Sequence, residues 1–415
     1  MHERGDVGHA TPPFEEPLGN ETRLLDPADL IDAPSEEPSL IATEEPCPAN
    51  SPAAKNSHLY LFFAPVEALL KDDDVSEVMI NGPKNIYVER KGKIVRVDCE
   101  FVSEQALQAA VMNVARSVGR FFNSQNPRLD ARLPDGSRVH AVLSPIARAG
   151  TTVAIRKFSK EKLTLEKLIS LGSISSEGAR LLDAIVKLGK NLIVSGATSS
   201  GKTSVLNVLS SLIPSDSRIL VLEDASELQL QQSHIVAFET RKPDEYGKGE
   251  VTIRHLLHST LRLRPDRIVV GEVRGEEALD LIQAMNTGHD GSMSTIHASN
   301  PQGALSRLEV CALLGSVEVP QFALRQQVAS AVQIVLQTER LADGSRKITS
   351  ISELLGLEKG EYRLEPILVF EETGYEPAPK SRILGRHVFT GYRPSFLKAA
   401  AQRGVDWVSI FPGWR

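Results

Sequence analysis

Features that mark several other classes of protein are missing from this sequence. No apolar run reaches the roughly 18 residues that a transmembrane helix needs, so no membrane span is expected. The N-terminal residues lack a basic stretch followed by an apolar core, so no secretory signal is expected. Both absences predict a cytoplasmic protein, and they leave open that it docks on a membrane protein.

Cysteine is scarce. The chain has three cysteines, Cys47, Cys99 and Cys311, which lie far apart and without C-x-x-C spacing. Disulfide frameworks and structural zinc sites depend on several cysteines at short, regular spacings. The sequence therefore predicts reduced thiols, with neither a disulfide framework nor a zinc site.

An excess of basic charge is missing as well. The net charge is −6, and residues 1–56 hold twelve Asp or Glu against three Lys or Arg, a balance of −9. The rest of the chain therefore carries only +3. Because nucleic-acid-binding proteins usually show a strong basic patch, no nucleic-acid partner is expected.

What is present is an ordinary globular composition, 41% hydrophobic and 24% charged, over 415 residues. This length predicts two domains and leaves room for a tail. Residues 1–56 predict a disordered, acidic, proline-rich tail, because nine of the 24 prolines fall there and apolar residues show little periodicity. An acidic linker is the simplest interpretation of the tail, and a partner-binding segment is the alternative.

Residues 57–158 predict a small α+β domain with an antiparallel sheet. Apolar residues recur at helical spacing in two segments, whereas other segments alternate in the manner of strands. Turns are expected at Arg90-Lys91-Gly92 and at Pro134-Asp135-Gly136. The expected helices are 58–71 and 104–118, and the expected strands are 75–80, 86–89, 93–97, 131–133, 138–142 and 151–157.

Residues 159–172 predict a linker, residues 173–375 a second domain, and residues 376–415 a C-terminal extension. In the second domain, continuous apolar strands alternate with helices, which indicates a doubly wound, mostly parallel sheet buried on both faces. The expected strands are 191–195, 218–222, 234–238, 267–271 and 291–296. Helices are expected at 175–188, 204–212, 251–263 and 275–286, then several between 301 and 340, followed by two hairpin-like stretches at 348–355 and 362–370 and a helix at 395–402.

The first expected strand of this domain runs directly into a P-loop pattern, G-x-x-x-x-G-K-T, and a helix follows it. Glycines let such a loop wrap closely around phosphate groups with its N–H groups pointing inward, and the helix N-terminus adds positive charge. In this pattern Lys202 reaches the β- and γ-phosphates, and the Thr203 hydroxyl can bind Mg²⁺. The expected nucleotide-binding residues are Gly196, Ala197, Thr198, Ser199, Ser200, Gly201, Lys202, Thr203 and Ser204.

Acidic residues and a histidine follow other strands of the same sheet. Ligands of open α/β sheets bind beyond the carboxyl ends of the strands, so these side chains are expected to converge. Glu272 follows an apolar strand as a Walker B acid does and would hold Mg²⁺. Glu223 comes directly off its strand and is the candidate for polarising the attacking water. His297 is a candidate for contacting the γ-phosphate.

Arginine is expected to stabilise the charge that develops on the transferred phosphoryl group. The sequence leaves the choice open among several arginines in both predicted domains, and surface solubility explains many of them. The candidates are Arg132, Arg138 and Arg156 in the first domain, and Arg241, Arg254, Arg262, Arg264 and Arg267 in the second.

With these residues in place, the sequence resembles the type II/IV secretion ATPase family, and within it the Flp/Tad pilus assembly ATPases of CpaF type. The resemblance covers the predicted folded core. It is carried by six ordered segments: 130–139, Ile155-Arg156-Lys157-Phe158, the P-loop, 222–228, 263–275 and 288–298.

The resemblance implies a RecA-like ATPase domain and a role for each matching position. The P-loop would be Walker A, Glu223 the catalytic base of an Asp box, and Glu272 the Walker B residue. The resemblance also places His289 and His297 in a His box, and it implies that Arg132, Arg138 and Arg156 close onto the nucleotide. It further implies Mg²⁺-dependent ATP hydrolysis by a homo-hexamer at the cytoplasmic face of the inner membrane, acting on inner-membrane platform proteins.

Two departures and three rival functions remain, and a non-enzymatic, nucleotide-regulated scaffold is one of the rivals. The tetracysteine zinc element of some type II members is absent, and an acidic tail is not a family feature. A RecA-like nucleic-acid motor is the main alternative, against which the near-neutral charge argues. A P-loop small-molecule kinase is another, and it would need an acceptor pocket and a lid.

Overall fold

The computed structural model describes residues 45–46, 60–90, 92–133, 135–158, 163–243, 247–315, 319–377, 381–402 and 410–411. Most of the predicted tail lies outside these residues. Within it, β1 (Glu45–Pro46) pairs in parallel with β4, so the prediction of disorder is wrong for these two residues.

The N-terminal sheet has seven strands in the order β1-β4-β3-β2-β7-β6-β5, and the pairs formed among β2 to β7 are all antiparallel. The α+β prediction is therefore confirmed. The strands are β2 (Val75–Asn81), β3 (Ile86–Arg90), β4 (Lys93–Asp98), β5 (Arg128–Arg132), β6 (Arg138–Val142) and β7 (Thr152–Arg156). The helices are the 3₁₀ segment η2 (Tyr60–Val66), α1 (Glu67–Lys71) and α2 (Glu104–Ser117).

Apolar alternation builds the core of this part. Val78 and Ile80 of β2 face the same side as Val88 of β3, and Leu107 and Val111 of α2 pack against them, all fully buried. The helix α2 begins where Ser103 accepts a hydrogen bond from the Ala106 N–H, as an N-cap does.

The larger sheet has nine strands in the order β10-β9-β11-β12-β8-β13-β14-β15-β16. The strands β10 to β13 in this order run parallel, and β14, β15 and β16 continue the sheet antiparallel. The parallel strands are β8 (Leu192–Gly196), β9 (Ile219–Glu223), β10 (Ile235–Glu239), β11 (Arg267–Val273), β12 (Met293–His297) and β13 (Ile334–Arg340), and the antiparallel ones are β14 (Arg346–Glu358), β15 (Glu361–Glu376) and β16 (Arg382–Phe389).

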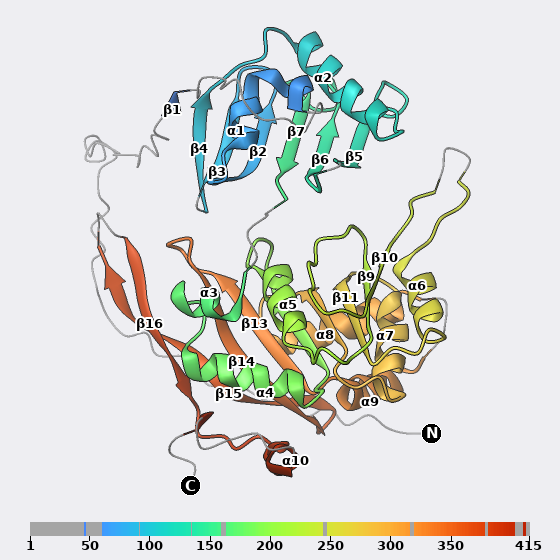
Figure 1. The fold of residues 1–415 in the computed structure, drawn as a ribbon, viewed down its shortest axis with the longest axis vertical. Helices are drawn as coiled ribbons and strands as arrows, with labels where there is room; N and C mark the ends of the chain where they lie inside the picture. Colours follow the sequence, from blue (N-terminus) through green and yellow to red (C-terminus); the bar gives the residue numbers. More distant parts are fainter. Residues whose placement is uncertain are drawn as a thin grey trace, which may run out of the picture. The chain divides into compact units, whose positions relative to one another are not determined.

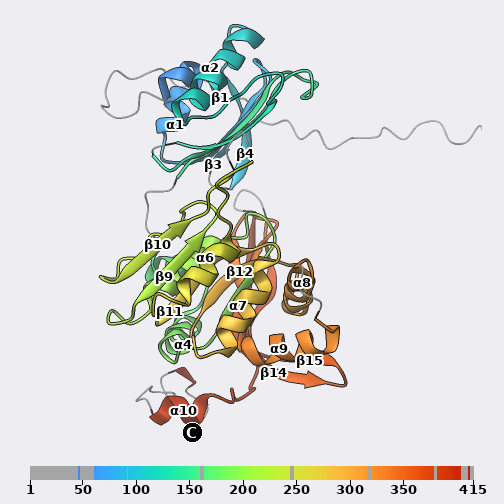
Figure 2. The same cartoon turned by 90° about the vertical axis from the view of Figure 1, so that its right-hand side faces the viewer.

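Helices cover both faces of this sheet, as the continuous apolar strands predict (Figures 1 and 2). Leu192 and Val194 of β8 pack with α4 and α5, whereas Ile193 packs with the helices of the other face. The helices are α3 (Leu165–Ser170), α4 (Ser176–Lys187), α5 (Lys202–Ser211), α6 (Ile253–Thr260), α7 (Glu277–Asn286), α8 (Pro301–Leu313), α9 (Gln321–Ala331) and α10 (Leu397–Gln402).

The end of the chain differs from the prediction in three ways. Residues 334–340 form β13 where only helices were expected, and this strand pairs with β8 in the centre of the sheet. The two expected hairpins are instead the two long strands β14 and β15, paired with each other. A further strand, β16, was not predicted, and β15 runs across the expected boundary between 375 and 376.

The cysteine prediction is wrong for one residue. Cys99 is disulfide-bonded, and its partner lies outside the described residues. Cys311 is a free, buried thiol on α8, as expected.

Candidate active site

The P-loop lies between β8 and α5, where its pattern predicts it. Gly196 ends β8 and Lys202 begins α5. Two residues of the loop have left-handed backbone, Ser199 at φ 61° and Gly201 at φ 95°. Gly196 has no room for a side chain, because a Cβ there would collide with Ser200 and with Thr338 of β13. The loop is therefore a tight wrap that the neighbouring strand supports.

Lys202 is held inside this wrap. Its side chain is mostly buried, with the residue 7% exposed, and Nζ donates to the Ala197 carbonyl at 2.9 Å. The same Nζ lies 3.3 Å from Nδ1 of His297. Burial lowers the pKa of Lys202, and the nearby Glu272 carboxylate partly offsets this effect. An anion entering the loop would find a preoriented, poorly hydrated cation.

The predicted catalytic residues come together at one edge of the large sheet. Neighbouring strands β9, β11, β12 and β8 are parallel, so their carboxyl ends meet there. Glu223 ends β9, Glu272 lies near the end of β11, and His297 ends β12. This edge also carries the P-loop, as expected of a ligand site in an open α/β sheet.

Glu223 is a buried carboxylate, 3% exposed. Its Oε1 accepts hydrogen bonds from the N–H groups of Glu227 at 2.8 Å and Leu228 at 3.0 Å. Burial raises the pKa of Glu223, and these two bonds limit the rise. Gly271 gives the side chain room, because a Cβ there would lie 3.1 Å from Glu223 Cγ. One oxygen is thus fixed to the backbone, which orients the carboxyl group for chemistry at the other.

Glu272 is bound by a histidine and an arginine. Its Oε1 lies 2.7 Å from Nε2 of His297, and its Oε2 accepts from Nε of Arg274 at 2.8 Å. Arg274 also lies 3.7 Å from the carboxylate of Asp224. Burial lowers the pKa of His297, and the positive charge of Lys202 lowers it further.

Arg274 is a site residue that sequence reasoning missed. It follows Glu272 by two positions, and residues two apart on extended chain point to the same side. That spacing was a signal that could have identified it.

These groups line one pocket of about 210 Å³. Its walls carry four fixed cationic groups, Arg138, Arg156, Lys202 and Arg274, and four carboxylates, Glu223, Asp224, Glu227 and Glu272. The other lining residues are Thr198, Ser199, Gly201, Thr203, Ser204, Ala225, Gly271 and His297. All five predicted catalytic residues, Lys202, Glu223, Glu272, His297 and Arg138, are therefore in this pocket.

Arginines of the N-terminal sheet contact the loop that follows Glu223. Arg138 lies 2.9 Å from Glu227 and 3.3 Å from the Ala225 carbonyl. Arg132 pairs with Glu239 at 3.1 Å and also donates to the Ser226 carbonyl. Of the three predicted arginines, Arg138 and Arg156 line the pocket, whereas Arg132 is not among its lining residues.

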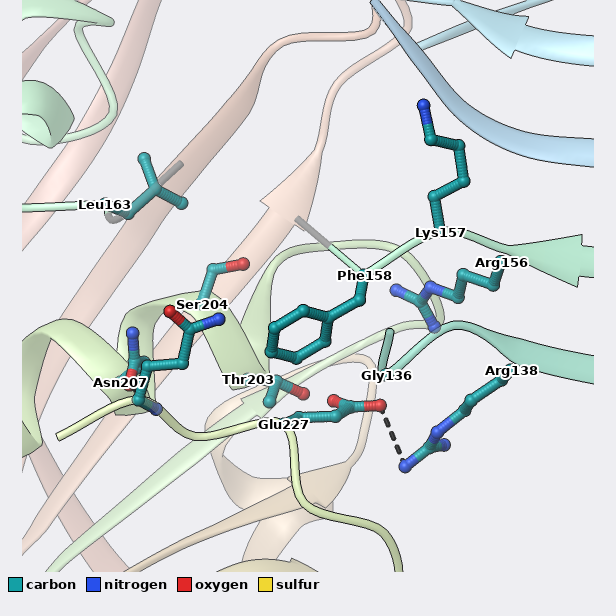
Figure 3. Close-up of a pocket in the computed structure, with 11 residues that line it drawn as sticks. Gly136, Arg138, Arg156, Lys157, Phe158, Leu163, Thr203, Ser204, Asn207 and Glu227 are labelled. Carbon is teal, nitrogen blue, oxygen red and sulfur yellow. Dashed lines mark hydrogen bonds and ion pairs between the residues drawn. The ribbon is translucent and has the colours of Figure 1, made fainter. Parts of the chain in front are cut away.

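A second pocket of about 170 Å³ adjoins the first and shares Arg138, Arg156, Thr203, Ser204 and Glu227 with it. Figure 3 shows the ring of Phe158 among these residues, with Arg138 facing Glu227. Asn207, Gln229, Leu163, Lys157 and Gly136 complete the lining. Gly136, at φ 91°, leaves space for the ring, because a Cβ there would lie 2.8 Å from Phe158 Cγ.

Five predicted binding residues do not line the pockets: Gly196, Ala197, Ser200, Arg132 and His289. Gly196, Ala197 and Ser200 belong to the P-loop, and the Ser200 hydroxyl bonds Thr338 at 2.9 Å. His289 precedes β12 and contacts the Ala284 carbonyl at 3.1 Å. Because β12 separates His289 from His297, the structure places these two histidines at opposite ends of that strand.

The donor groups present fit the predicted Mg²⁺ site. Thr203 and Glu272 offer a hydroxyl and a carboxylate to the same pocket, and Mg²⁺ is commonly bound by one or two protein oxygens together with phosphates and water. Among the described residues, no cluster of three or more His, Cys, Asp or Glu is arranged to hold a metal. No helix in this part of the chain is long and apolar enough to cross a membrane.

The parallel sheet, the P-loop and the strand-end residues define a RecA-like domain preceded by a smaller α+β part. The model of the family Type II/IV secretion system protein matches residues 62–386, and this chain belongs to that family.

Similar proteins agree with this membership. Rv3659c of Mycobacterium tuberculosis, whose name refers to conjugal transfer, is 35% identical over 311 residues, 74% of this chain and 87% of that protein. The type IV secretion system protein VirB11 of Bartonella quintana is 30% identical over 326 residues, 69% of this chain and 90% of that protein. The solved structure of the Legionella pneumophila ATPase DotB shares the fold, with TM-score 0.50, 17% identity, and coverage of 76% of this chain and 84% of that one.

Proposed function

We propose that this chain is an Mg²⁺-dependent ATPase that works as a hexamer and converts ATP hydrolysis into mechanical work for Flp/Tad-type pilus assembly or protein secretion across the cell envelope. It would act at the cytoplasmic face of the inner membrane, on platform proteins there. One observation carries the proposal: Lys202, Glu223 and Glu272 line a single pocket at the P-loop edge of a RecA-like sheet.

Each group has a chemical task that its position supports. The loop N–H groups and Lys202 would bind the phosphates, and Thr203 and Glu272 would hold Mg²⁺. When bound, Mg²⁺ would neutralise charge on the β- and γ-phosphate oxygens. Glu223, with one oxygen fixed by two N–H groups, would orient the attacking water and accept its proton.

Two further groups would respond to the γ-phosphoryl group. His297 lies between Lys202 and Glu272 and would contact that group directly. Arg138 comes from the N-terminal sheet and would supply positive charge as the phosphoryl group transfers. Since Arg138 contacts the loop after Glu223, hydrolysis would also change the contacts that hold the N-terminal sheet there.

The second pocket supports binding of the nucleoside. Phe158 offers a ring face, and Asn207 and Gln229 offer amide groups beside it. An adenine base would stack on Phe158 while its phosphates extend past Thr203 into the first pocket. The five residues shared by the two pockets make this path continuous.

The apparatus that the motor would drive is the more specific part of the proposal. The Flp/Tad assignment rests on the ordered motifs of the sequence. The relatives carry names of conjugal transfer and type IV secretion, which supports work on a secretion apparatus as well. Both activities use a motor that pushes on a membrane-embedded assembly, and both fit the absence of a spanning helix among the described residues.

A pull-down from membranes tests which membrane apparatus the motor drives. Wild-type protein and a Glu272→Gln variant are used as bait, because slowed hydrolysis should prolong the partner complex. Recovery of a polytopic membrane protein together with a prepilin supports pilus assembly, and recovery of a secretion channel supports secretion. Mass measurement in solution, with and without Mg²⁺-ATP, tests the hexamer. A protein that stays monomeric under both conditions contradicts it.

A further inference from the structure

The outer side of the P-loop is held by an arginine far along the sequence. Arg346, the first residue of β14, donates from Nε to the Ser199 carbonyl at 2.9 Å. Its stem also packs near Gly201, where a Cβ would lie 3.3 Å from Arg346 Cδ. Ser199 and Gly201 are the two loop residues with left-handed backbone. Arg346 therefore bonds the loop at Ser199, a non-glycine residue for which left-handed backbone is strained.

The inner side of the loop is held separately. Thr338 of β13 bonds the Ser200 hydroxyl at 2.9 Å and donates to the Ser195 carbonyl at 3.1 Å. These contacts are buried and lie within one sheet. Arg346 differs from Thr338 because its guanidinium has further donors that point away from the loop.

Those donors face Glu89 on β3 of the N-terminal sheet. Nη2 of Arg346 lies 3.8 Å from Oε1 of Glu89, and Nη2 of Arg340 lies at the same distance from that oxygen. The Glu89 side chain is only 14% exposed, and Oε1 accepts no hydrogen bond within the described part of the chain. A carboxylate in such surroundings depends on nearby cations for its stability.

Glu89 is also connected to the pocket through two strand pairings in its own sheet. It pairs with Glu77 of β2, and Glu77 pairs with Arg156 of β7, which lines the pocket. The N-terminal sheet is thus connected to the nucleotide site in two ways: Arg156 lines the pocket, and Glu89 lies near Arg346, which bonds the P-loop.

We propose that Arg346 is a positioning residue that holds the P-loop in its phosphate-binding conformation and couples it to the N-terminal sheet through Glu89. This inference rests on the proposed function, because the ligand of the loop is taken to be a nucleotide. Placement of the sheet would then set nucleotide affinity. If the N-terminal sheet moved and took Glu89 with it, Arg346 would lose its ion pair with Glu89. Its hydrogen bond to the Ser199 carbonyl would then be weaker.

The test measures the affinity of the full chain for a fluorescent ATP analogue with Mg²⁺, together with KM and kcat. Arg346→Ala should weaken binding about tenfold, which equals about 1.4 kcal/mol at 25 °C. KM should rise in parallel while kcat changes by less than about threefold, because a change in ground-state binding raises KM alone. Arg346→Lys should recover part of the affinity, since one ammonium can reach Ser199 but lacks the second arm of the fork.

Arg340→Ala is the matched control. Arg340 lies at the same distance from the same carboxylate, but its other bond goes to the Gly92 carbonyl instead of the P-loop. Its loss should change nucleotide affinity by less than about twofold. Amide exchange should separate the two variants, with faster exchange in residues 196–204 for Arg346→Ala and no change there for Arg340→Ala.

Glu89→Gln tests the coupling. It should weaken nucleotide binding about two- to threefold in the wild-type background and have no further effect on Arg346→Ala, as expected for residues acting through one contact. Independent, additive effects would overturn the coupling. Thermal unfolding of each variant shows whether it is folded, and Arg346→Lys keeps the test valid if the alanine variant is not.

Lys202→Ala separates failure of this inference from failure of the proposed function. If Lys202→Ala loses nucleotide binding while Arg346→Ala binds as the wild type does, the role of Arg346 is wrong and the nucleotide site stands. If the wild-type chain binds no ATP analogue, the proposed function fails and the inference fails with it.

Discussion

Nε2 of His297 lies 2.7 Å from Oε1 of Glu272, the acid expected to hold Mg²⁺. The other nitrogen of the same ring, Nδ1, lies 3.3 Å from Nζ of Lys202. Burial and the charge of Lys202 lower the pKa of His297, which favours the neutral form of the ring. One imidazole ring therefore lies between Lys202 and Glu272, which links the phosphate-binding and metal-binding sides of the pocket.

Replacement of this histidine should therefore affect turnover more than binding. We expect His297→Ala to lower kcat for ATP hydrolysis by about 10- to 100-fold, because one preoriented group near the γ-phosphate is lost. The affinity for the ATP analogue should change by only a few-fold, since the loop N–H groups and Lys202 remain. Phosphate release and analogue titration on the same preparation measure the two quantities.

His289→Ala provides the comparison. The resemblance assigns both histidines to one box, whereas the structure places His289 against the Ala284 carbonyl, away from the pocket lining. We expect His289→Ala to lower kcat much less than His297→Ala does, if each histidine acts on the nucleotide bound by its own chain. Equal losses would contradict that assignment.

The raised pKa of Glu223 gives a prediction about stability and pH. Its carboxyl group has an ordinary pKa in the unfolded chain and a raised one in the fold, mainly through burial. Stability from such a group is fully present below the unfolded pKa and is lost as pH rises through the folded pKa. At about pH 8 the buried charge thus costs stability that a neutral isostere does not.

Glu223→Gln should accordingly lower kcat by about 100- to 10,000-fold, as loss of a general base does. Its Tm should equal or exceed that of the wild type at about pH 8, and the difference should shrink toward about pH 5. The glutamine oxygen can keep both N–H bonds from Glu227 and Leu228. A variant that loses both turnover and several degrees of Tm at pH 8 would show that Glu223 is structural.

Arg138 tests the contribution of the N-terminal sheet to catalysis. Arg138→Ala should lower kcat by about 100-fold or more, since charge stabilisation by an arginine is a large effect in phosphoryl transfer. Arg128→Ala on the same hairpin is the control, because Arg128 is exposed and lines neither pocket. Equal activity of the two variants, measured by phosphate release, would remove Arg138 from the site.

Phe158 tests the base pocket. Phe158→Ala should raise KM for ATP roughly 5- to 50-fold, which corresponds to about 1 to 2 kcal/mol of stacking. Phe158→Tyr or Trp should restore most of the affinity, because any aromatic face can stack. Measurement of pyrophosphate affinity provides the control, since a ligand without a base should bind both proteins equally. A wild-type KM for Phe158→Ala would place the base elsewhere.

Much of the large sheet could be predicted because β8, β9 and β11 are continuous apolar runs, which is how strands buried on both faces appear in sequence. β13 is buried as β8, β9 and β11 are, but its apolar sequence stops after Leu336 and is followed by Gln337 and Thr338. Those polar residues are buried because they bond Ser195, more than 100 residues earlier in the chain. Local periodicity contains no signal for such a contact.

The candidate site divides in the same way. Glu223, Glu272 and His297 could be placed from topology alone, since parallel neighbouring strands bring their carboxyl ends together. Arg346 could not, because its bond to Ser199 spans 147 positions and depends on the path of β14. The resemblance groups His289 with His297, whereas the structure places the two histidines at opposite ends of β12.

Steady-state release of phosphate from Mg²⁺-ATP by the wild type, Lys202→Ala and Glu272→Ala is the most direct test of the account. Lys202 and Glu272 both line the pocket, and each should be needed for turnover. The account predicts measurable wild-type turnover and a loss of at least about 100-fold in each variant, with Tm values unchanged. Full turnover in both variants would contradict the assignment of this pocket as the site of hydrolysis.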